Sequence, residues 1–433
     1  MESKKILRLS RRQCLSSASL ALGLSLATTS ARHSLASASH GIWASERIRV
    51  GAIGVGGRGS LLLEQLPETA QVVAVADCNL PRAEAFRAKM KADWDVHSDY
   101  RRILDRSDID AVIVATGEFQ RIKPCIEACL AGKDVYAEKP LSLYIQEGRA
   151  LVEVARKTGR IVQVGTQQRS MEMNRVACQL IREGGLGKVL EVRAIAYEGP
   201  SLSPREPFVA EDKPAGLDWN LWLNQAADRS YNSRWMGWMQ WRDFAGGQMT
   251  NWGAHGVDQI QWALGMDATG PVELQPLTEG LNGQVRMKYA NGVVVNFVIE
   301  PGKGPMGGAV FLCEKGKLEI NRNKFSSNPP EIANELLKQV DSVEEERKWS
   351  DDLALWQARW HLQNWLDCIQ TRKLPVADVE IGHRSVSVCH LANITRELQR
   401  PLHWDPEKEI FSGDEEANQL LTRPRRKGFE LPS

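Results

Sequence analysis

The sequence predicts an α/β protein with two domains: a doubly wound parallel sheet, followed by an α+β domain built on an open, mainly antiparallel sheet. Between residues 46 and 166, short apolar segments alternate with helical patterns, which is typical of a parallel sheet. From residue 167 to 433 this alternation stops, and Asn291-Gly292 and Lys315-Gly316 mark two hairpins. A chain of 433 residues is long enough to bury a core in each domain.

The first expected strand, Ile48 to Ile53, leads into a glycine-rich turn and then into the helical residues 60–66. The turn has the pattern G-x-G-x-x-G in the context that a dinucleotide site requires. Gly54 allows the tight turn, Gly56 lets backbone N–H groups approach a pyrophosphate, and Gly59 lets helix and strand pack closely. An ordinary strand-to-helix turn is the alternative. The residues expected to contact a cofactor here are Gly54, Gly56, Gly57, Arg58 and Gly59.

A second strand, Gln71 to Ala76, ends in Asp77, at the spacing where a carboxylate accepts hydrogen bonds from an adenosine ribose. The same carboxylate would repel a 2′-phosphate, so Asp77 favours NAD over NADP. We therefore interpret residues 46–166 as an NAD(P)-binding Rossmann domain.

Capping residues and glycines delimit the other elements of this domain. Asn79 and Pro81 begin a helix, Ser98 and Ser142 are expected to cap two more, and Gly159 ends the last one. The expected helices span residues 80–93, 98–106, 124–131 and 142–158, and the expected strands span residues 109–115, 134–137 and 161–165. Thr116 follows the fourth strand and is expected to contact the cofactor.

The second domain has strand signals at residues 189–197, 284–289 and 293–299, and helical patterns at residues 331–368 and 382–400. Seven of the fourteen tryptophans fall between Trp219 and Trp262. Flat aromatic faces suit the C–H faces of a sugar, but aromatic residues also dominate cores, and the sequence leaves both interpretations open.

Composition excludes several classes of function. The formal net charge is +1, so no overall field recruits nucleic acid or an anionic membrane. The eight cysteines have neither zinc-ligand spacing nor the pattern of a disulfide framework, and no metal site is expected.

Residues 1–38 have the order of an export signal. Basic residues lead to Arg11-Arg12, an apolar run from Leu15 to Ala27 follows, and Ala36-Ser37-Ala38 offers a cleavage site. The twin arginine indicates a Tat-type signal and a periplasmic protein; a disordered basic tail is the alternative. The apolar run is too short for a stable membrane span, and none is expected in the mature chain.

Two segments carry candidate catalytic residues. The strand that ends at Ala137 continues into Glu138-Lys139-Pro140, at the edge of the sheet where ligands bind, so the ammonium of Lys139 could stabilise a developing alkoxide. Further along, helical spacing places Asn251, His255 and Asp258 on one face, and His255 could take a hydroxyl proton. A helix-end histidine satisfied by its neighbours is the alternative.

These segments together resemble the Gfo/Idh/MocA oxidoreductases, the family of glucose-fructose oxidoreductase and inositol dehydrogenase. The ordered set comprises the glycine turn, Glu138-Lys139-Pro140, Gly246-Gly247 and Gly253-x-His255-x-x-Asp258. Residues 163–170 and the tail motifs Gly382-His383-Arg384 and Trp404-Asp405-Pro406 resemble its exported bacterial branch.

The resemblance implies NAD(P)-dependent oxidation or reduction of a sugar or cyclitol. It implies that Lys139 contacts nicotinamide and substrate, that His255 is the acid/base, and that the Lys139-Pro140 peptide is cis. Homo-oligomers are common in the family, and the open sheet is the expected face for one. Glu138 is expected at the cofactor, and the expected substrate contacts are Gln167, Arg169, Tyr197, Asn251, Trp252 and Asp258.

Two departures from the family pattern matter. Residues 116–121 replace a common Thr-Pro-Asp-His-x-His segment, so contacts of that loop do not carry over. Asn251 stands where many members have Asp, and an amide cannot stabilise an imidazolium as a carboxylate does. His255 is therefore expected to be a weaker base unless Asp258 or another acid replaces that carboxylate.

Three hypotheses follow. The first is an exported oxidoreductase whose tightly bound NAD is recycled between sugar substrates. The second is a glycoside hydrolase or lyase that oxidises a hydroxyl transiently, eliminates the glycosidic substituent and returns the hydride. The third is a sugar-binding protein that retains the cofactor fold without catalysis.

Overall fold

The computed structural model describes residues 47–204, 206–341 and 357–432. The expected export signal lies outside these ranges, as does part of the predicted helix 331–368. Within the described ranges, none of the helices combines the length and the apolar character needed to cross a bilayer.

The first domain contains a six-stranded sheet in the order β3-β2-β1-β4-β5-β6, and all of its strand pairs are parallel. The predicted doubly wound sheet is confirmed. The strand order reverses between β1 and β4, and the carboxyl ends of these strands form the edge where ligands bind in such sheets. The elements are β1 (Ile48–Ile53), α1 (Gly57–Glu64), β2 (Ala70–Ala76), α2 (Leu80–Met90), β3 (Asp95–His97), α3 (Arg101–Leu104), β4 (Ala111–Val114), α4 (Glu118–Leu130), β5 (Asp134–Ala137), α5 (Ile145–Thr158) and β6 (Val162–Val164).

Some helix starts differ from the predictions. The helix expected at Pro124 begins at Glu118, because Pro124 lies inside α4 rather than in its first turn. The segment 116–121 is therefore largely helical. Ser98 and Ser142 do not cap helices: Tyr100 precedes α3, and Tyr144 precedes α5.

The second domain contains a nine-stranded sheet in the order β13-β12-β11-β7-β10-β9-β8-β14-β15. Only the pair β7–β10 is parallel among its described pairs, so the predicted mainly antiparallel sheet is confirmed. Both predicted hairpins form, and Gly292 has φ +86° in the first of them. The strands are β7 (Val189–Ile195), β8 (Pro271–Pro276), β9 (Val285–Tyr289), β10 (Val294–Ile299), β11 (Ala309–Cys313), β12 (Gly316–Asn321), β13 (Lys324–Asn328), β14 (Leu402–Asp405) and β15 (Ile410–Phe411).

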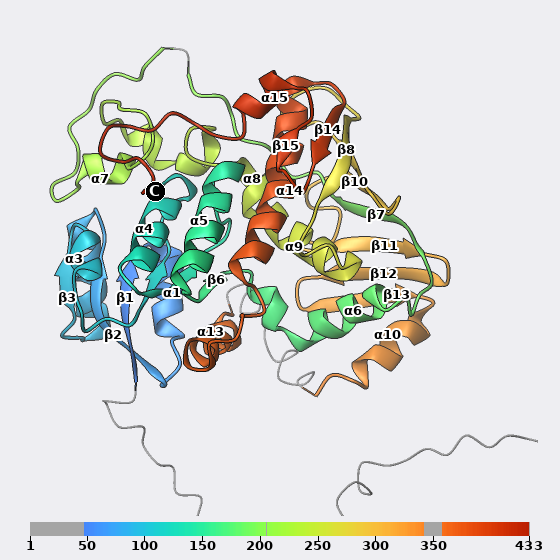
Figure 1. The fold of residues 1–433 in the computed structure, drawn as a ribbon, viewed down its shortest axis with the longest axis horizontal. Coiled ribbons are helices and arrows are strands. Elements are labelled where there is room, and N and C mark those ends of the chain that lie inside the picture. The colour runs from blue at the N-terminus through green and yellow to red at the C-terminus, as the bar shows by residue number, and fades with distance from the viewer. Residues whose placement is uncertain (1–46, 205, 342–356, 433) are drawn as a thin grey trace, which may run out of the picture. The chain divides into compact units, whose positions relative to one another are not determined.

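Helices α6, α9 and α14 lie against one face of this sheet (Figure 1). Its other face carries exposed side chains such as Leu190, Arg286 and Lys288. The helices of the second domain are η2 (Gln167–Ser170), α6 (Glu172–Arg182), α7 (Trp219–Leu223), η3 (Ser233–Met236), η4 (Trp238–Gln240), α8 (Gly247–Asn251), α9 (Gly253–Leu264), α10 (Pro330–Leu337), α13 (Arg359–Thr371), α14 (Val379–Leu398) and α15 (Glu415–Gln419).

The C-terminal part of the chain returns to the first domain. Trp365 of α13 is fully buried and makes an edge contact with Tyr136 of β5 at 5.7 Å between ring centroids. Near the C-terminus, which lies beside α4 in Figure 1, Arg423 donates to the carbonyl of Phe119 at 2.7 Å. The core of the first domain therefore includes residues far beyond the expected boundary at residue 166.

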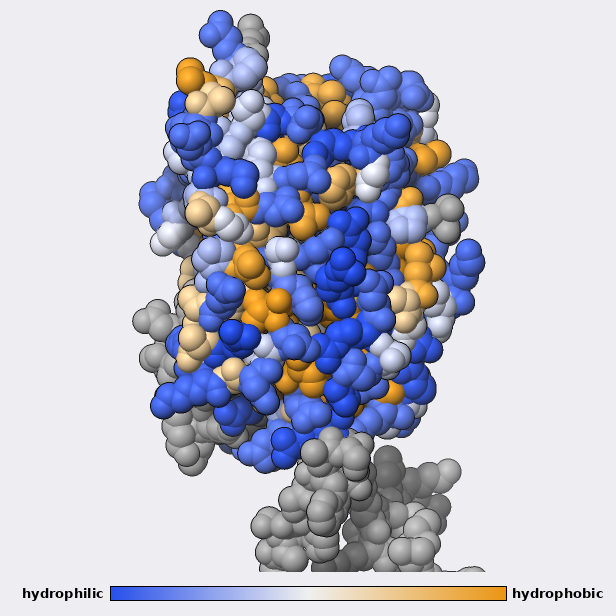
Figure 2. Space-filling model, turned by 90° about the vertical axis from the view of Figure 1, so that its left-hand side faces the viewer, coloured by the Kyte–Doolittle hydropathy of each residue, from blue (hydrophilic) through white to orange (hydrophobic). Residues whose placement is uncertain are grey.

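One face of the molecule is mainly hydrophilic, with apolar residues in small separate groups (Figure 2). Large exposed apolar side chains among the described residues are also spread over different elements, as Leu130, Val209 and Leu374 illustrate.

Candidate active site

A cavity of about 920 Å³ lies at the carboxyl edge of the parallel sheet, where α8, α9 and the β12–β13 turn face it. It is lined by most of the predicted site residues. The predicted residues that line it are Gly54, Gly56, Gly57, Arg58, Asp77, Thr116, Glu138, Lys139, Asn251, Trp252 and His255.

Two positions of the glycine turn require glycine for steric reasons. Gly54 has φ +85°, and a side chain at Gly59 would place its Cβ 2.1 Å from the carbonyl oxygen of Gly54. A Cβ at Gly56 would meet nothing closer than 3.9 Å, and one at Gly57 would have no neighbour within 4 Å. The turn therefore presents open backbone at the N-terminus of α1, as a bound pyrophosphate requires.

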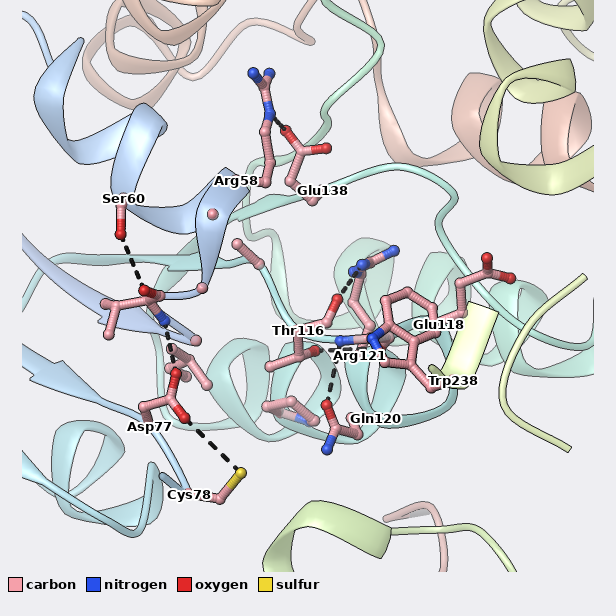
Figure 3. A pocket seen from close by; sticks show the side chains of 18 of the residues that line it. Arg58, Ser60, Asp77, Cys78, Thr116, Glu118, Gln120, Arg121, Glu138 and Trp238 are labelled. Atoms are coloured by element: carbon pink, nitrogen blue, oxygen red, sulfur yellow. Dashed lines mark hydrogen bonds and ion pairs between the residues drawn. The ribbon is translucent and has the colours of Figure 1, made fainter. Parts of the chain in front are cut away.

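Asp77 is fixed at the end of β2. Its Oδ2 accepts a hydrogen bond from the backbone N–H of Val55 at 3.1 Å (Figure 3). Its Oδ1 accepts one from the backbone N–H of Asn79 at 2.9 Å. Arg82 lies 3.4 Å from Oδ2. A carboxylate held in this way between the glycine turn and α2 fits the ribose hydroxyls of a dinucleotide.

Glu138 and Arg58 form an ion pair in the wall of the cavity. The Nε of Arg58 donates to Oε1 of Glu138 at 2.8 Å, and Glu138 is buried (Figure 3). The ion pair links the loop after β5 to the start of α1, so it stabilises the wall between the glycine turn and Lys139.

Lys139 is held by a residue of the second domain. Its Nζ donates to Oδ1 of Asn251 at 2.9 Å and to the carbonyl oxygen of Asn251 at 3.1 Å. Burial lowers the pKa of Lys139 to about 8, although the charge of Glu138 acts in the opposite direction. The Lys139-Pro140 peptide is cis, as the family resemblance implied.

His255 is buried in the same cavity, and its Nδ1 has no hydrogen-bond partner among the described residues. Burial lowers the pKa of His255 well below its ordinary value, and the positive charges of Arg322 and Lys139 add to this effect. The imidazole is therefore neutral near neutral pH.

Asp258 does not share the face of Asn251 and His255. Although it lies three residues after His255 in the same helix, α9, Asp258 does not line the cavity, and its carboxylate binds the Nε of Arg169 at 2.8 and 2.9 Å. Arg169 also binds Asp267 at 2.7 Å, and Ser385 donates to Asp258 at 2.8 Å. This buried cluster occupies both Arg169 and Asp258, so Asp258 cannot replace the acid that Asn251 lacks.

Two other predicted substrate contacts, Gln167 and Tyr197, are also buried outside the cavity lining. The hydroxyl of Tyr197 accepts a hydrogen bond from the N–H of Gly307 at 3.2 Å. The predicted contact of these residues with substrate thus finds no support in their placement.

Glu118 is a cavity residue that the sequence did not reveal, because residues 116–121 were expected to be a loop. It is 1% exposed, and its carboxylate accepts hydrogen bonds from the N–H of Gly246 at 3.0 Å and from the hydroxyl of Thr250 at 3.1 Å. Burial raises the pKa of Glu118 to about 7. It therefore connects the start of α4 to α8, the helix that ends at Asn251.

Arg322 is the second residue that was missed. It lies in the β12–β13 turn with φ +57°, donates to Oε1 of Gln168 at 2.6 Å, and lies over the ring of Trp252 at 5.4 Å. Burial, together with the charge of Arg58, lowers the pKa of Arg322 to about 9. No motif marks this position, because only the hairpin brings it to the cavity.

The tryptophans of this stretch lie both at the cavity and in the core. Trp222, Trp238 and Trp252 line the cavity. Trp222 also belongs to an aromatic core cluster with the buried Trp235 and Phe244. The cluster supports a cavity wall whose aromatic faces are available to a ligand.

Two family models match the chain, and together they cover most of it. The N-terminal model, an oxidoreductase family with an NAD-binding Rossmann fold, matches residues 48–166, and the C-terminal alpha/beta domain model of the same oxidoreductases matches residues 179–431. The chain belongs to the Gfo/Idh/MocA oxidoreductase family. The resemblance to this family is confirmed, whereas the exported branch stays a prediction. The first domain is an NAD-binding domain, whose glycine turn and Asp77 fit this cofactor.

Curated relatives match a limited part of the chain. Inositol 2-dehydrogenase of Klebsiella pneumoniae is 31% identical over 150 residues, which are 34% of this chain and 44% of that protein. The 2,7-anhydro-N-acetylneuraminate hydratase of Mediterraneibacter gnavus is 35% identical over 132 residues, 30% of this chain and 34% of that protein. The chain thus spans less than half of the length of these relatives.

Solved structures match much more of the chain. The WlbA dehydrogenase of Bordetella pertussis, solved with NADH and UDP-GlcNAcA, has a TM-score of 0.61 at 18% identity, covering 83% of this chain and 98% of that one. Levoglucosan dehydrogenase, solved with NADH and levoglucosan, has a TM-score of 0.57 at 17% identity, covering 82% and 99%. At these identities the likeness concerns the fold.

Proposed function

We propose that the protein transfers a hydride between NAD and a ring carbon of a sugar or cyclitol. The observation that carries this proposal is that Lys139, Asn251 and His255 come together in one cavity. Asp77 and the glycine turn line the same cavity. Relatives and structural neighbours named for inositol and levoglucosan support a hydroxylated ring as substrate.

The chain's own residues would hold the cofactor along the sheet edge. The glycine turn and the N-terminus of α1 receive the pyrophosphate, and Asp77 receives the adenosine ribose. NAD, when bound, supplies the hydride acceptor. The nicotinamide end then falls near Lys139, at the carboxyl end of β5.

Proton transfer would rest on Lys139 and His255. The ammonium of Lys139 donates a hydrogen bond to the substrate oxygen on which negative charge develops. Neutral His255 accepts the hydroxyl proton. Because Arg322 and Lys139 disfavour the imidazolium, we infer that Glu138, whose charge acts on both cations, rather than Asp258, is the acid that offsets the positive charge of this cavity.

Three aromatic residues would orient the ring. Trp222, Trp238 and Trp252 present flat faces to the cavity, and such faces pack against the C–H groups of a sugar. A rigid ring held by them reaches the geometry that hydride transfer requires without further ordering.

We infer further that the protein is exported with its cofactor. The Tat-type pattern of residues 1–38 motivates this, since Tat substrates cross the membrane folded. NAD that cannot be exchanged in the periplasm would be recycled, the hydride returning to the same or to a second sugar. We also infer a homo-oligomer that uses the exposed face of the nine-stranded sheet.

The experiment is a screen of NAD-loaded protein against aldohexoses and inositols, with the absorbance of reduced nicotinamide as readout. Lys139→Met should retain NAD and lose about 100-fold or more in turnover, because one charged donor to the oxyanion is gone. Lys303→Met, at an exposed turn, is the matched control. Unchanged turnover of Lys139→Met would refute the proposal.

A further inference from the structure

A second hollow, of about 470 Å³, adjoins the cavity. Trp238 and Met239 line both spaces, so the two share a wall. A chain of hydrogen bonds also connects them. Asn251, which binds Nζ of Lys139, donates from its Nδ2 to Oε1 of Gln248 at 3.0 Å, and Gln248 lines the hollow. The hollow therefore lies next to the reacting centre.

The lining of the hollow has the chemistry of a sugar site. Ser201, Gln240 and Gln248 supply hydroxyl and amide groups that both donate and accept, which matches sugar hydroxyls. Trp238 supplies an aromatic surface beside them. Polar groups that fix orientation beside an apolar surface are typical of small-molecule sites.

The charge of the lining excludes one class of ligand. Among the described residues that form the hollow there is no lysine or arginine, and the one ionisable group is the exposed carboxylate of Glu198. A diphosphate would meet no cation there, although phosphate recognition depends on such charge-assisted hydrogen bonds. The hollow therefore suits an uncharged group.

Backbone hydrogen bonds hold the walls of the hollow together. The N–H of Ser201 donates to the carbonyl of Gln240 at 2.7 Å, and the N–H of Arg242 donates to the carbonyl of Ser201 at 2.9 Å. These bonds fix the two segments that form its walls. Walls that are held in place lose less conformational entropy when a ligand binds, so binding costs less free energy.

We propose that this hollow is the subsite for a second, uncharged sugar ring, so that the substrate is a neutral glycoside rather than a free monosaccharide or a nucleotide sugar. The inference rests on the proposed function. The reacting ring occupies the cavity beside Lys139, the glycosidic bond passes Trp238 and Met239, and the second ring contacts Gln240 and Gln248.

The test compares three sets of probes on NAD-loaded protein: free aldohexoses and inositols, neutral disaccharides that contain the same aldohexoses, and the corresponding UDP-sugars. The readout is kcat/KM for nicotinamide reduction. The proposal predicts that a disaccharide is preferred over its free aldohexose by about tenfold or more, which corresponds to one added hydrogen bond and a packed ring face.

Two variants locate the second ring. Ser201→Phe should block the hollow and Gln240→Ala should remove an amide, and each should lower kcat/KM for the disaccharide by about tenfold while that for the free aldohexose stays within about twofold. Gln275→Ala, at an exposed position of β8, is the control and should change neither.

The outcomes separate this inference from the proposed function. Preference for free sugars, preference for UDP-sugars, or equal effects of both variants on all substrates would overturn the subsite but leave the oxidoreductase. If no probe of any set reduces the bound NAD, the proposed function itself fails, and the subsite fails with it.

Discussion

The Nζ atom of Lys139 lies 2.9 Å from Oδ1 of Asn251. The first residue follows a strand of the parallel sheet, and the second ends α8 in the other domain. Because the partner is an amide, burial is not offset at this contact by a negative charge, and the pKa of Lys139 stays at about 8. The substitution of Asn for the usual Asp therefore acts on Lys139 as well as on His255.

Asn251→Asp should move the pH profile. A carboxylate in contact with the ammonium raises the pKa of Lys139 by about 1–3 units. If the protonated lysine is the active form, kcat/KM of the wild type falls as pH rises through about 8, and the fall in the variant occurs at higher pH. Gln248→Glu is the control. Residue 248 contacts Asn251 rather than the ammonium of Lys139, so this variant should shift the alkaline fall of kcat/KM less. The same alkaline limb in Asn251→Asp and wild type would contradict this role of Lys139.

Glu118 should make the protein less stable as pH rises. Burial raises the pKa of Glu118 from 4.5 to about 7, so the folded state binds a proton more tightly than the unfolded state. This contribution is complete below pH 4.5 and is lost as pH rises through 7; it is on the order of 3 kcal/mol in the free energy of unfolding.

Urea unfolding of wild type and Glu118→Gln at pH 5 and pH 8 measures this effect. The amide cannot ionise, so the variant should lose less stability than wild type between the two values. Glu331→Gln, at an exposed position of α10, should behave as wild type does. An equal pH dependence in wild type and Glu118→Gln would mean that Glu118 is ionised throughout.

Asp77→Ser should change the choice of cofactor. The variant removes the carboxylate that would bind the ribose hydroxyls, and it leaves Arg82 at the same edge to meet a 2′-phosphate. We expect the Kd for NAD to rise about tenfold or more, the effect of losing charged hydrogen bonds, and the Kd for NADP to fall. Calorimetric titration of both nucleotides measures this, with Asp93→Ser as an exposed control. If the Kd for NADP does not fall in Asp77→Ser, a residue other than Asp77 determines the preference for NAD over NADP.

Asp258→Asn should affect stability rather than substrate binding. Removing this carboxylate leaves Arg169 with Asp267 as its remaining acidic partner, so the cost should be smaller than about 3–5 kcal/mol, the cost of a fully broken buried pair. Thermal unfolding should report this loss, whereas KM measured on the folded fraction should stay close to that of wild type. A large increase in KM without loss of stability would instead restore the predicted role of Asp258 in substrate contact.

The sequence predicted the part of the cavity that the parallel sheet forms, because each motif there directly follows a strand. The glycine turn, Asp77 and Lys139 all follow strands of one sheet, and strand ends converge by the rules of parallel topology. The parallel sheet and the cis peptide at Pro140 also agreed with the predictions.

Tertiary placement decided the rest. Glu118 was missed because Pro124 suggested a later helix start, and Arg322 because only the β12–β13 turn brings it to the cavity. Asp258 was misplaced because the spacing of three residues from His255 within α9 does not reveal that its carboxylate pairs with Arg169 outside the cavity lining. The return of α13 to the first domain likewise left no local signal in the sequence.

Deuterium transfer tests the central claim most directly. NAD-loaded protein is mixed with a sugar substrate that carries deuterium on its hydroxyl-bearing carbons, and the reaction is quenched within one turnover, before the hydride is returned. Mass spectrometry then measures the mass of the released nucleotide. The account predicts deuterium on the nicotinamide in wild type and in Lys303→Met, and its near absence in Lys139→Met. Product formation with nicotinamide that never acquires deuterium would contradict hydride transfer at this site.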